Sequence, residues 1–327
     1  MASDQTHQAP GDVEHRERGD VEHRDPDVWR ATAIGGGHGL ARTLAALTRV
    51  VDEVSAVVTV ADDGGSSGRL RRDLDVLPPG DLRMALATLA RDRELAELIQ
   101  YRFDRGELEG HSLGNLMIVA LQELSAGDPV RGLDRLARLL AVPGRVLPCS
   151  RVPVDLHGRT AAATLTGQAC LTRTPGIEQV WLEPSDPPVT PEAVGAIRDA
   201  DLIVLGPGSL FTSLLPNLLV PGIAAALSVR RAPAVFVANL REQPGETQDM
   251  TITDHLDVLE RHVPGLTLDA IVVHEGARPS GGGLALEAGG EDLAARVGRV
   301  VRRDLLDGRD GHDPASLAGA LSEVLDV

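Results

Sequence analysis

Residues 31 to 69 restrict the fold of this chain more than any other stretch. The stretch opens with a short apolar run, Ala31 to Ile34, followed by four glycines in five positions. Apolar residues at helical spacing follow from Leu40 to Leu47, and a second apolar run covers Ala56 to Ala61. A polar segment that ends in Arg69 closes the stretch. The pattern predicts a strand, a glycine loop, a helix, a second strand and a polar loop.

The glycine loop has the composition of an anion-binding turn. It comprises Gly35, Gly36, Gly37, His38 and Gly39. Glycine lets the backbone adopt positive φ angles and approach a ligand closely. The loop amides and the first helical turn would point at one spot, where the helix dipole favours a negative group by ~0.3–1 kcal/mol. We therefore expect a phosphate here; the alternative is a plain strand-to-helix turn, because the run is not a G-x-G-x-x-G motif.

A second polar segment follows the next strand. It consists of Asp62, Asp63, Gly64, Gly65, Ser66 and Ser67, and Arg69 comes two residues later. Asp62 lies 27 residues after Gly35, near the ~20-residue offset at which a carboxylate meets a ribose hydroxyl in dinucleotide folds. Either Asp62 or Asp63 could instead hold Mg²⁺ through water and phosphate oxygens. Adjacent residues on an extended backbone point apart, so we expect only one carboxylate to face a ligand.

Composition excludes several classes of protein. The chain has 327 residues, 43% of them hydrophobic, which is enough for one large α/β domain or two small ones. Its net charge of −16 argues against a nucleic-acid surface. All 32 lysine-plus-arginine positions are arginine, which excludes a Walker A lysine and Schiff-base chemistry. Cys149 and Cys170 form no C-x-x-C motif, so neither a disulfide framework nor a zinc site is indicated.

We expect a cytoplasmic protein with no membrane span, because no apolar run reaches ~18 residues and no signal-peptide pattern is present. Residues 1–28 are charged and contain the repeat GDVEHR, which predicts a disordered tail. Residues 29–327 are expected to form a single domain. Within it, helical patterns at about 70–141 predict an inserted helical cap, and β-rich segments from 145 to 183 predict an antiparallel excursion.

Strand and helix patterns alternate again after residue 190. A buried strand at 201–205 is followed by a third loop of the same kind, which consists of Gly206, Pro207, Gly208 and Ser209. Helices are predicted at 210–227, 252–262, 292–305 and 314–325, with glycines at 281–283. The fold class is therefore α/β with a mostly parallel sheet, whose strand ends bring the loops to one edge.

The helical region holds further candidates. Arg69 and Arg83 are candidates to bind a phosphate through two N–H groups of the guanidinium. The alternative is that they form surface ion pairs with nearby aspartates. Asp81 is predicted to cap the helix at 82–90. The segment Gly110–Gly114 matches the G-x-S-x-G elbow of hydrolases, but the charged residues before it cannot form a buried strand. We interpret Ser112 as a helix N-cap that leaves His111, Gly114 and Asn115 to face a ligand.

Six blocks of sequence, in order along the chain, resemble the YvcK-type gluconeogenesis factors, which are related to the CofD-like 2-phospho-L-lactate transferases. The blocks are Ile34–Gly39, Val58–Gly68, Leu77–Arg83, Gly110–Leu116, Gly206–Leu210 and Asn239–Thr247. The resemblance implies a single CofD-like domain with a Rossmann-like three-layer α/β/α fold that binds a nucleotide diphosphate. It also adds Asn239, Gln243 and Glu246 to the site. Two departures are His38, where threonine is expected, and Met84-Ala85, where a more polar pair is expected.

The resemblance implies two functions. One is a regulatory factor that binds a UDP-sugar and links gluconeogenic growth to cell-wall synthesis and cell shape through a protein partner, and we expect it to be a homodimer. The other is a Mg²⁺-dependent transferase that moves a phospholactyl group from a guanylyl donor to a deazaflavin; the 2% aromatic content supplies few stacking partners for such a ring. Binding of NAD or a GDP-like ligand is a further alternative.

Overall fold

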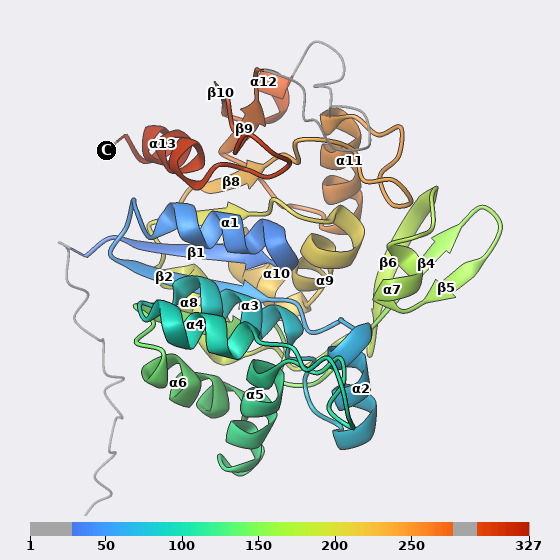
Figure 1. The fold of residues 1–327 in the computed structure, drawn as a ribbon. Helices are drawn as coiled ribbons and strands as arrows, with labels where there is room; N and C mark the ends of the chain where they lie inside the picture. The colour runs from blue at the N-terminus through green and yellow to red at the C-terminus, as the bar shows by residue number, and fades with distance from the viewer. Residues whose placement is uncertain (1–27, 277–292, 327) are drawn as a thin grey trace, which may run out of the picture.

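The computed structural model describes residues 28–276 and 293–326. The predicted tail, apart from its last residue, and the glycines at 281–283 lie outside the described residues. The core of the structure is a seven-stranded, entirely parallel sheet with the order β10-β9-β8-β7-β1-β2-β3 (Figure 1). The strands are β1 (Arg30–Gly35), β2 (Glu53–Val58), β3 (Gly144–Pro148), β7 (Leu202–Leu205), β8 (Ala234–Val237), β9 (Ala270–His274) and β10 (Arg299–Arg303).

The strand order reverses beside β1. The chain moves from β1 to β2 and β3 on one side, and the later strands β7 to β10 extend the sheet on the other side. In open α/β sheets the connections leaving the two central strands diverge at such a switch point, and a crevice opens at the carboxyl ends of the strands. The loops after β1 and β7 are therefore the first place to look for a ligand site.

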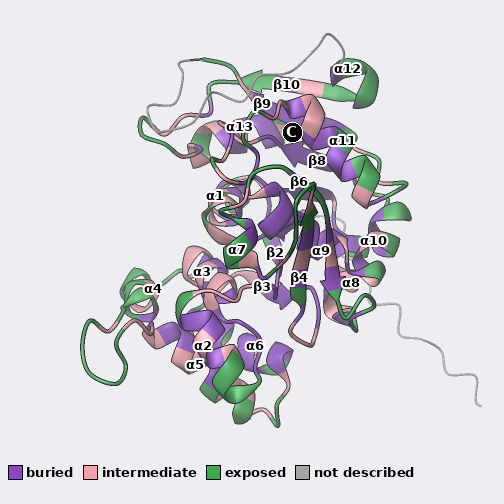
Figure 2. Cartoon of the chain, turned by 90° about the vertical axis from the view of Figure 1, so that its right-hand side faces the viewer, coloured by how far each residue is buried: buried purple, intermediate pink, exposed green. Residues whose placement is uncertain are grey.

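Helices cover both faces of the sheet and give three layers. Strand β1 shows the alternation, since Ala31 and Ala33 pack in the core on one face and Ile34 packs in the core on the other; β8 is buried along its whole length (Figure 2). The first face is covered by α1 (Gly37–Leu47), α3 (Gly80–Leu89), α6 (Pro129–Leu139) and α13 (Pro314–Leu325). The second face is covered by α8 (Pro191–Asp199), η1 (Leu210–Leu214), α9 (Leu215–Leu218), α10 (Pro221–Ser228) and α11 (Ile252–His262).

The predicted helical insertion is the crossover from β2 to β3. Besides α3 and α6 it contains α2 (Gly65–Leu74), α4 (Arg93–Gln100) and α5 (Leu113–Glu123). Helix α2 begins at Gly65 rather than Leu70, so the predicted polar loop is largely the first turn of a helix. Helices α3 and α6 contribute buried leucines to the sheet's core, and Ile99 of α4 and Ile118 of α5 belong to the same core, whereas Leu70 of α2 packs in a separate small cluster.

The antiparallel excursion is a separate three-stranded sheet of β4 (Asp155–Thr160), β5 (Thr164–Thr166) and β6 (Ile177–Glu183), with the short helix α7 (Gln168–Leu171). It projects from the main body beside α9 and α11 (Figure 1). The amide of Val180 donates a hydrogen bond of 3.0 Å to Nε2 of His262 on α11, whose Nδ1 donates to the Val258 carbonyl at 2.8 Å. A neutral histidine with its proton on Nδ1 therefore fastens the excursion to the core.

Three predicted elements differ from the structure. Strand β3 was missing from the prediction, because the β-rich region from 145 was assigned as a whole to the excursion. The predicted helix at 210–227 is three short segments, since Pro216 and Pro221 cannot donate the hydrogen bonds of a continuous helix. The predicted helix at 292–305 is α12 (Leu293–Arg296) followed by edge strand β10, with Gly298 between them.

No single helix among residues 28–276 and 293–326 is long and apolar enough to cross a membrane. The bent pair formed by Leu210–Leu218 and Pro221–Ser228 passes this test when its two parts are taken together, and the test concerns only length and composition.

Replacing His262 by Gln should make the stability of the protein less dependent on pH. Burial holds the pKa of His262 below its ordinary value of 6.5, so the unfolded chain takes up the proton first and stability is lost as the pH falls below about 6.5. Urea unfolding at pH 7.5 and 5.5 should show a drop that is smaller in His262→Gln by on the order of 1 kcal/mol, which is the effect of one proton that only the unfolded chain takes up between these pH values. An equal drop in both proteins would contradict this role.

Candidate functional site

The loops after β1 and β7 touch at the switch point. A Cβ on residue 39 would overlap the carbonyl oxygen of Pro207, so this approach requires glycine. Gly37 adopts a φ of +60°, and α1 has neither a side-chain cap nor an acidic residue in its first turn. Helix α1 has eleven residues, and its amino end lies between two glycine loops. This arrangement binds anions in other α/β folds.

The segment after strand β8 supplies the residue that fixes the second loop. The side-chain oxygen of Asn239 accepts from the Gly208 amide, and its nitrogen donates to the Gly208 carbonyl, both at 2.9 Å. Gln243 donates to the Ser209 hydroxyl at 2.9 Å. A cavity of about 550 Å³ opens beside these loops. Its lining includes His38, Gly39, Arg42, Pro207, Gly208, Asn239, Arg241 and Gln243.

Glu246 has a different place from the predicted one. Its buried carboxylate accepts hydrogen bonds from the amides of Phe211 and Thr212, at 2.8 and 3.2 Å, and from the Thr212 hydroxyl at 3.0 Å. Burial raises the pKa of this carboxyl group. Glu246 thus occupies the amino end of η1, where the resemblance had suggested a ligand contact, and it acts by positioning the loop after β7 rather than by touching a ligand.

The two aspartates after β2 point in different directions, as the extended backbone requires. Asp62 accepts from the Gly64 amide at 2.9 Å and lies beside Ser67 and Gly80. Asp63 accepts from the amide of Ala169 at 2.8 Å and so binds the excursion instead. Of the two alternatives for a metal ligand, the structure therefore favours Asp62 and assigns Asp63 to fastening α7.

Asp81 is the site residue that sequence reasoning missed. The structure starts α3 at Gly80 with Pro79 at the N-cap, so Asp81 is in the first turn and is not the predicted cap. Its carboxylate lies against Gly36 and accepts from the Gly37 amide, and it is close enough to Asp62 for the two charges to interact. Burial and the charge of Asp62 raise the pKa of Asp81 to about 6. The Pro-Pro-Gly turn before it was the only signal, and it indicated a helix start.

Asp62 and Asp81 together can hold a divalent cation. No group of three or more His, Cys, Asp or Glu residues is placed for a metal within the described part of the chain. Mg²⁺ commonly uses one or two carboxylates and completes its octahedron with water and phosphate oxygens. Two neighbouring carboxylates whose charges interact and whose pKa values are both raised, next to a helix terminus suited to phosphate, fit that donor set.

A chain of hydrogen bonds runs through the helical crossover. Arg83 Nε donates to the side-chain oxygen of Asn115, and Asn115 Nδ2 donates to the Ser66 hydroxyl, both at 3.0 Å. Ser66 in turn lies 3.0 Å from Nδ1 of His111. Ser112 caps α5 as predicted, accepting from the Asn115 amide at 3.4 Å. The structure thus brings these predicted residues together next to the amino end of α2, which begins at Gly65 after the extended N-cap Gly64.

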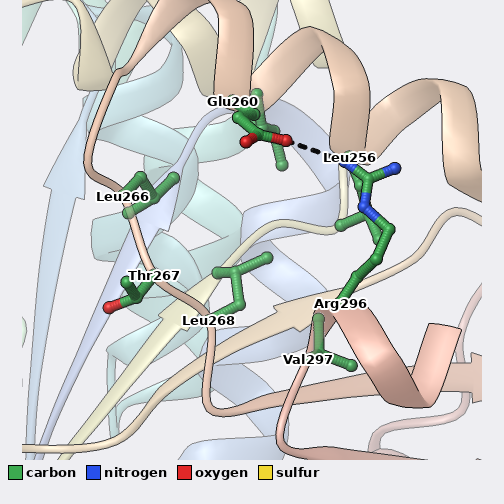
Figure 3. Close-up of a pocket in the computed structure, with 8 residues that line it drawn as sticks. Leu256, Glu260, Leu266, Thr267, Leu268, Arg296 and Val297 are labelled. Atoms are coloured by element: carbon green, nitrogen blue, oxygen red, sulfur yellow. Dashed lines mark hydrogen bonds and ion pairs between the residues drawn. The ribbon is translucent and has the colours of Figure 1, made fainter.

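Another cavity, of about 480 Å³, lies at the opposite edge of the sheet. Its walls come from α11, the segment before β9 and α12, and Arg296 there binds Glu260 at 3.0 Å (Figure 3). None of its lining residues belongs to a glycine loop. The predicted site residues are gathered at the carboxyl edge, away from this cavity.

The fold and the site define a Rossmann-like α/β protein with glycine loops at the switch point of its sheet. Residues 31–288 match the family model of the 2-phospho-L-lactate transferase CofD, so the chain belongs to the CofD family. A relative named "Putative gluconeogenesis factor" from Mycobacterium tuberculosis (strain ATCC 25618 / H37Rv) is 46% identical, over 89% of this chain and 89% of the relative. A relative named "Gluconeogenesis factor" from Halalkalibacterium halodurans is 45% identical, over 73% of this chain and 76% of the relative.

A solved structure supports the same grouping. The crystal structure of a member of the UPF0052 family from Bacillus halodurans superposes with a TM-score of 0.83 and 36% identity, over 90% of this chain and 98% of that chain. The Rossmann-like prediction and the predicted family are thereby confirmed. The roles of the individual site residues stay predictions, and the structure adds their positions and hydrogen-bond partners.

Replacing Glu246 by Gln should destabilise the protein by about 1–3 kcal/mol, because a buried amide group would face donors that now bind a carboxylate. The free energy of unfolding in urea checks this value. The exposed Glu97 on α4 provides a matched control, and Glu97→Gln should change stability by less than about 0.5 kcal/mol. Equal stabilities of the two variants would refute the positioning role of Glu246.

Proposed function

We propose that this protein binds a nucleoside diphosphate sugar, with a UDP-sugar as the preferred class, and acts as a regulatory factor. The observation that carries the proposal is the approach of Gly39 to Pro207, which leaves the amino end of α1 between two glycine loops beside the cavity of about 550 Å³. A diphosphate at this terminus would receive backbone amides and the positive end of the helix dipole. The nucleoside or the sugar would occupy the neighbouring cavity.

The names of the relatives support the regulatory part of the proposal. Proteins called gluconeogenesis factors are similar over most of this chain, and a sensor of carbon supply needs a ligand whose level follows sugar metabolism. A nucleotide sugar that feeds cell-wall synthesis has that property. The cytoplasmic location, the homodimer and the protein partner in cell-wall regulation belong to the same proposal.

A metal-dependent transferase is the second candidate, and one observation favours it. The carboxylates of Asp62 and Asp81 are close enough for their charges to interact, and Asp81 lies against Gly36, so Mg²⁺ held by them could bind a diphosphate at the glycine loop. Transfer of phosphorus-containing groups depends chiefly on positioning and charge stabilisation. The same site could therefore support transfer from a nucleotide diphosphate ester to an acceptor.

Calorimetric titration of the full chain with UDP-GlcNAc, GDP and NAD, with and without Mg²⁺, separates these functions. We expect UDP-GlcNAc to bind without turnover, and Gly39→Ala to weaken it at least about tenfold because the new methyl group pushes the two loops apart. Gly195→Ala, in an open position on α8, is the matched control and should bind as the parent does. Turnover would favour the transferase, and a chain that binds none of the three would overturn both proposals.

Mg²⁺ should strengthen binding of UDP-GlcNAc only where Asp81 is ionised. With a pKa of about 6 for this carboxyl group, the effect of Mg²⁺ should be full at pH 7.5 and should fall away as the pH drops below 6, because protons compete with the cation. Asp81→Asn should abolish the Mg²⁺ effect. Asp63→Asn should retain it, since Asp63 faces the excursion, and loss of the effect in both variants would count against the assignment.

A further inference from the structure

Three arginines converge around His111 at the outer end of the hydrogen-bond chain. Arg69 donates to the carbonyl of Glu109 at 2.8 Å, and Arg102 donates to the carbonyl of Gly110 at 2.5 Å. Both guanidinium groups thus meet at the backbone just before His111. Arg83 approaches from the inside through Asn115 and Ser66, which contacts His111. Positive charges from α2, α3 and the segment after α4 are therefore brought to one place.

No close ion pair in the described part of the chain compensates the charge of this cluster, although Asp81 interacts with Arg83 and Asp73 interacts with His111 at longer range. Within residues 28–276 and 293–326, the structure pairs none of Arg69, Arg83 and Arg102 with a carboxylate within 4 Å, whereas Arg71 pairs with Asp155 at 2.7 Å. The acceptors of the three arginines are neutral carbonyl and amide oxygens. In a chain with a net charge of −16, in which acidic residues are abundant, three neighbouring cations without a carboxylate in ion-pair contact indicate a place for an external anion.

Arg83 is the most constrained member. It is only 6% exposed, and only its Nε has an acceptor among the described residues, which leaves the two terminal nitrogens available. A Cβ on residue 114 would lie 2.9 Å from Cγ and Cδ of Arg83, so Gly114 gives the side chain room to pass. Burial and the nearby Arg102 also lower the pKa of Arg83. A buried cation with free donors gains more from an anion than an exposed one does.

We infer that Arg69, Arg83 and Arg102, with His111, form a second anion subsite that binds a carboxylate or phosphate group. It lies on the helical crossover, near Asp81, whose charge interacts with Arg83. The inference rests on the proposed function and deepens it. The anion could be carried by the group attached to the diphosphate, as in an acidic nucleotide sugar, or by a separate small molecule. The shared chemistry is an oxyanion with several acceptor oxygens.

The first arm of the test does not depend on nucleotide binding. Inorganic phosphate is titrated against the full chain by calorimetry, with and without saturating UDP-glucose, for the parent, Arg102→Gln and Arg105→Gln. Arg105 lies three residues along the same segment, its side chain is 94% exposed, and it serves as a matched loss of charge. We expect Arg102→Gln to weaken phosphate at least about fivefold and Arg105→Gln to leave it unchanged.

The second arm compares UDP-glucuronate with UDP-glucose, which differ by one carboxylate. We expect UDP-glucuronate to bind about tenfold more tightly to the parent, and Arg102→Gln to remove this preference while UDP-glucose binds as before. An effect in this arm assigns the anion to the nucleotide sugar, and an effect in the phosphate arm alone assigns it to a separate molecule. If Arg102→Gln and Arg105→Gln behave alike in both arms, the subsite is refuted, even if UDP-glucose binds. If no UDP-sugar binds, the proposed function fails and the phosphate arm still decides the subsite.

Discussion

The contact between the amino end of α1 and the Pro207 carbonyl is the constraint on which the site depends. It exists because residue 39 has no side chain, and it holds the loops of two neighbouring strands together where the strand order reverses. Asn239 fixes the second loop from the segment after β8, and Glu246 occupies the amino end of η1. The fold thus satisfies the terminus of η1 with Glu246, whereas the terminus of α1 has no cap from its own N-cap residue and only the Asp81 carboxylate on its Gly37 amide.

Opposite charges are arranged in order along the carboxyl edge. Backbone amides come first at α1, two carboxylates follow at Asp62 and Asp81, and the cluster of Arg69, Arg83 and Arg102 comes last. The raised pKa of Asp81 reflects the cost of burying two carboxyl groups together, a cost that a bound cation would remove. An arrangement of this kind suits a ligand with several charges better than a neutral one.

Much of this arrangement could be predicted from the sequence, because glycine loops and apolar strand runs are local signals. The convergence of the loops after β1, β2 and β7 followed from parallel pairing alone. The roles of Asp63, Asp81 and Glu246 could not be predicted, since each depends on a partner far along the chain: Ala169, Gly37 and Phe211. Strand β10 was mistaken for helix because only Val301 of its residues is buried, so its alternation is too short to be recognised.

The connection between β2 and β3 has a consequence for how such proteins diversify. Asp81, Arg83, His111 and Asn115 all belong to this one connection, whereas the residues at the diphosphate position come from the loops after β1 and β7 and from the segment after β8. Neighbouring parallel strands tolerate exchange of the segment that joins them as long as its packing helices are kept. Selection can therefore retain the loops that bind the diphosphate while it replaces the residues that contact the attached group. Relatives with the same scaffold can in this way bind different ligands.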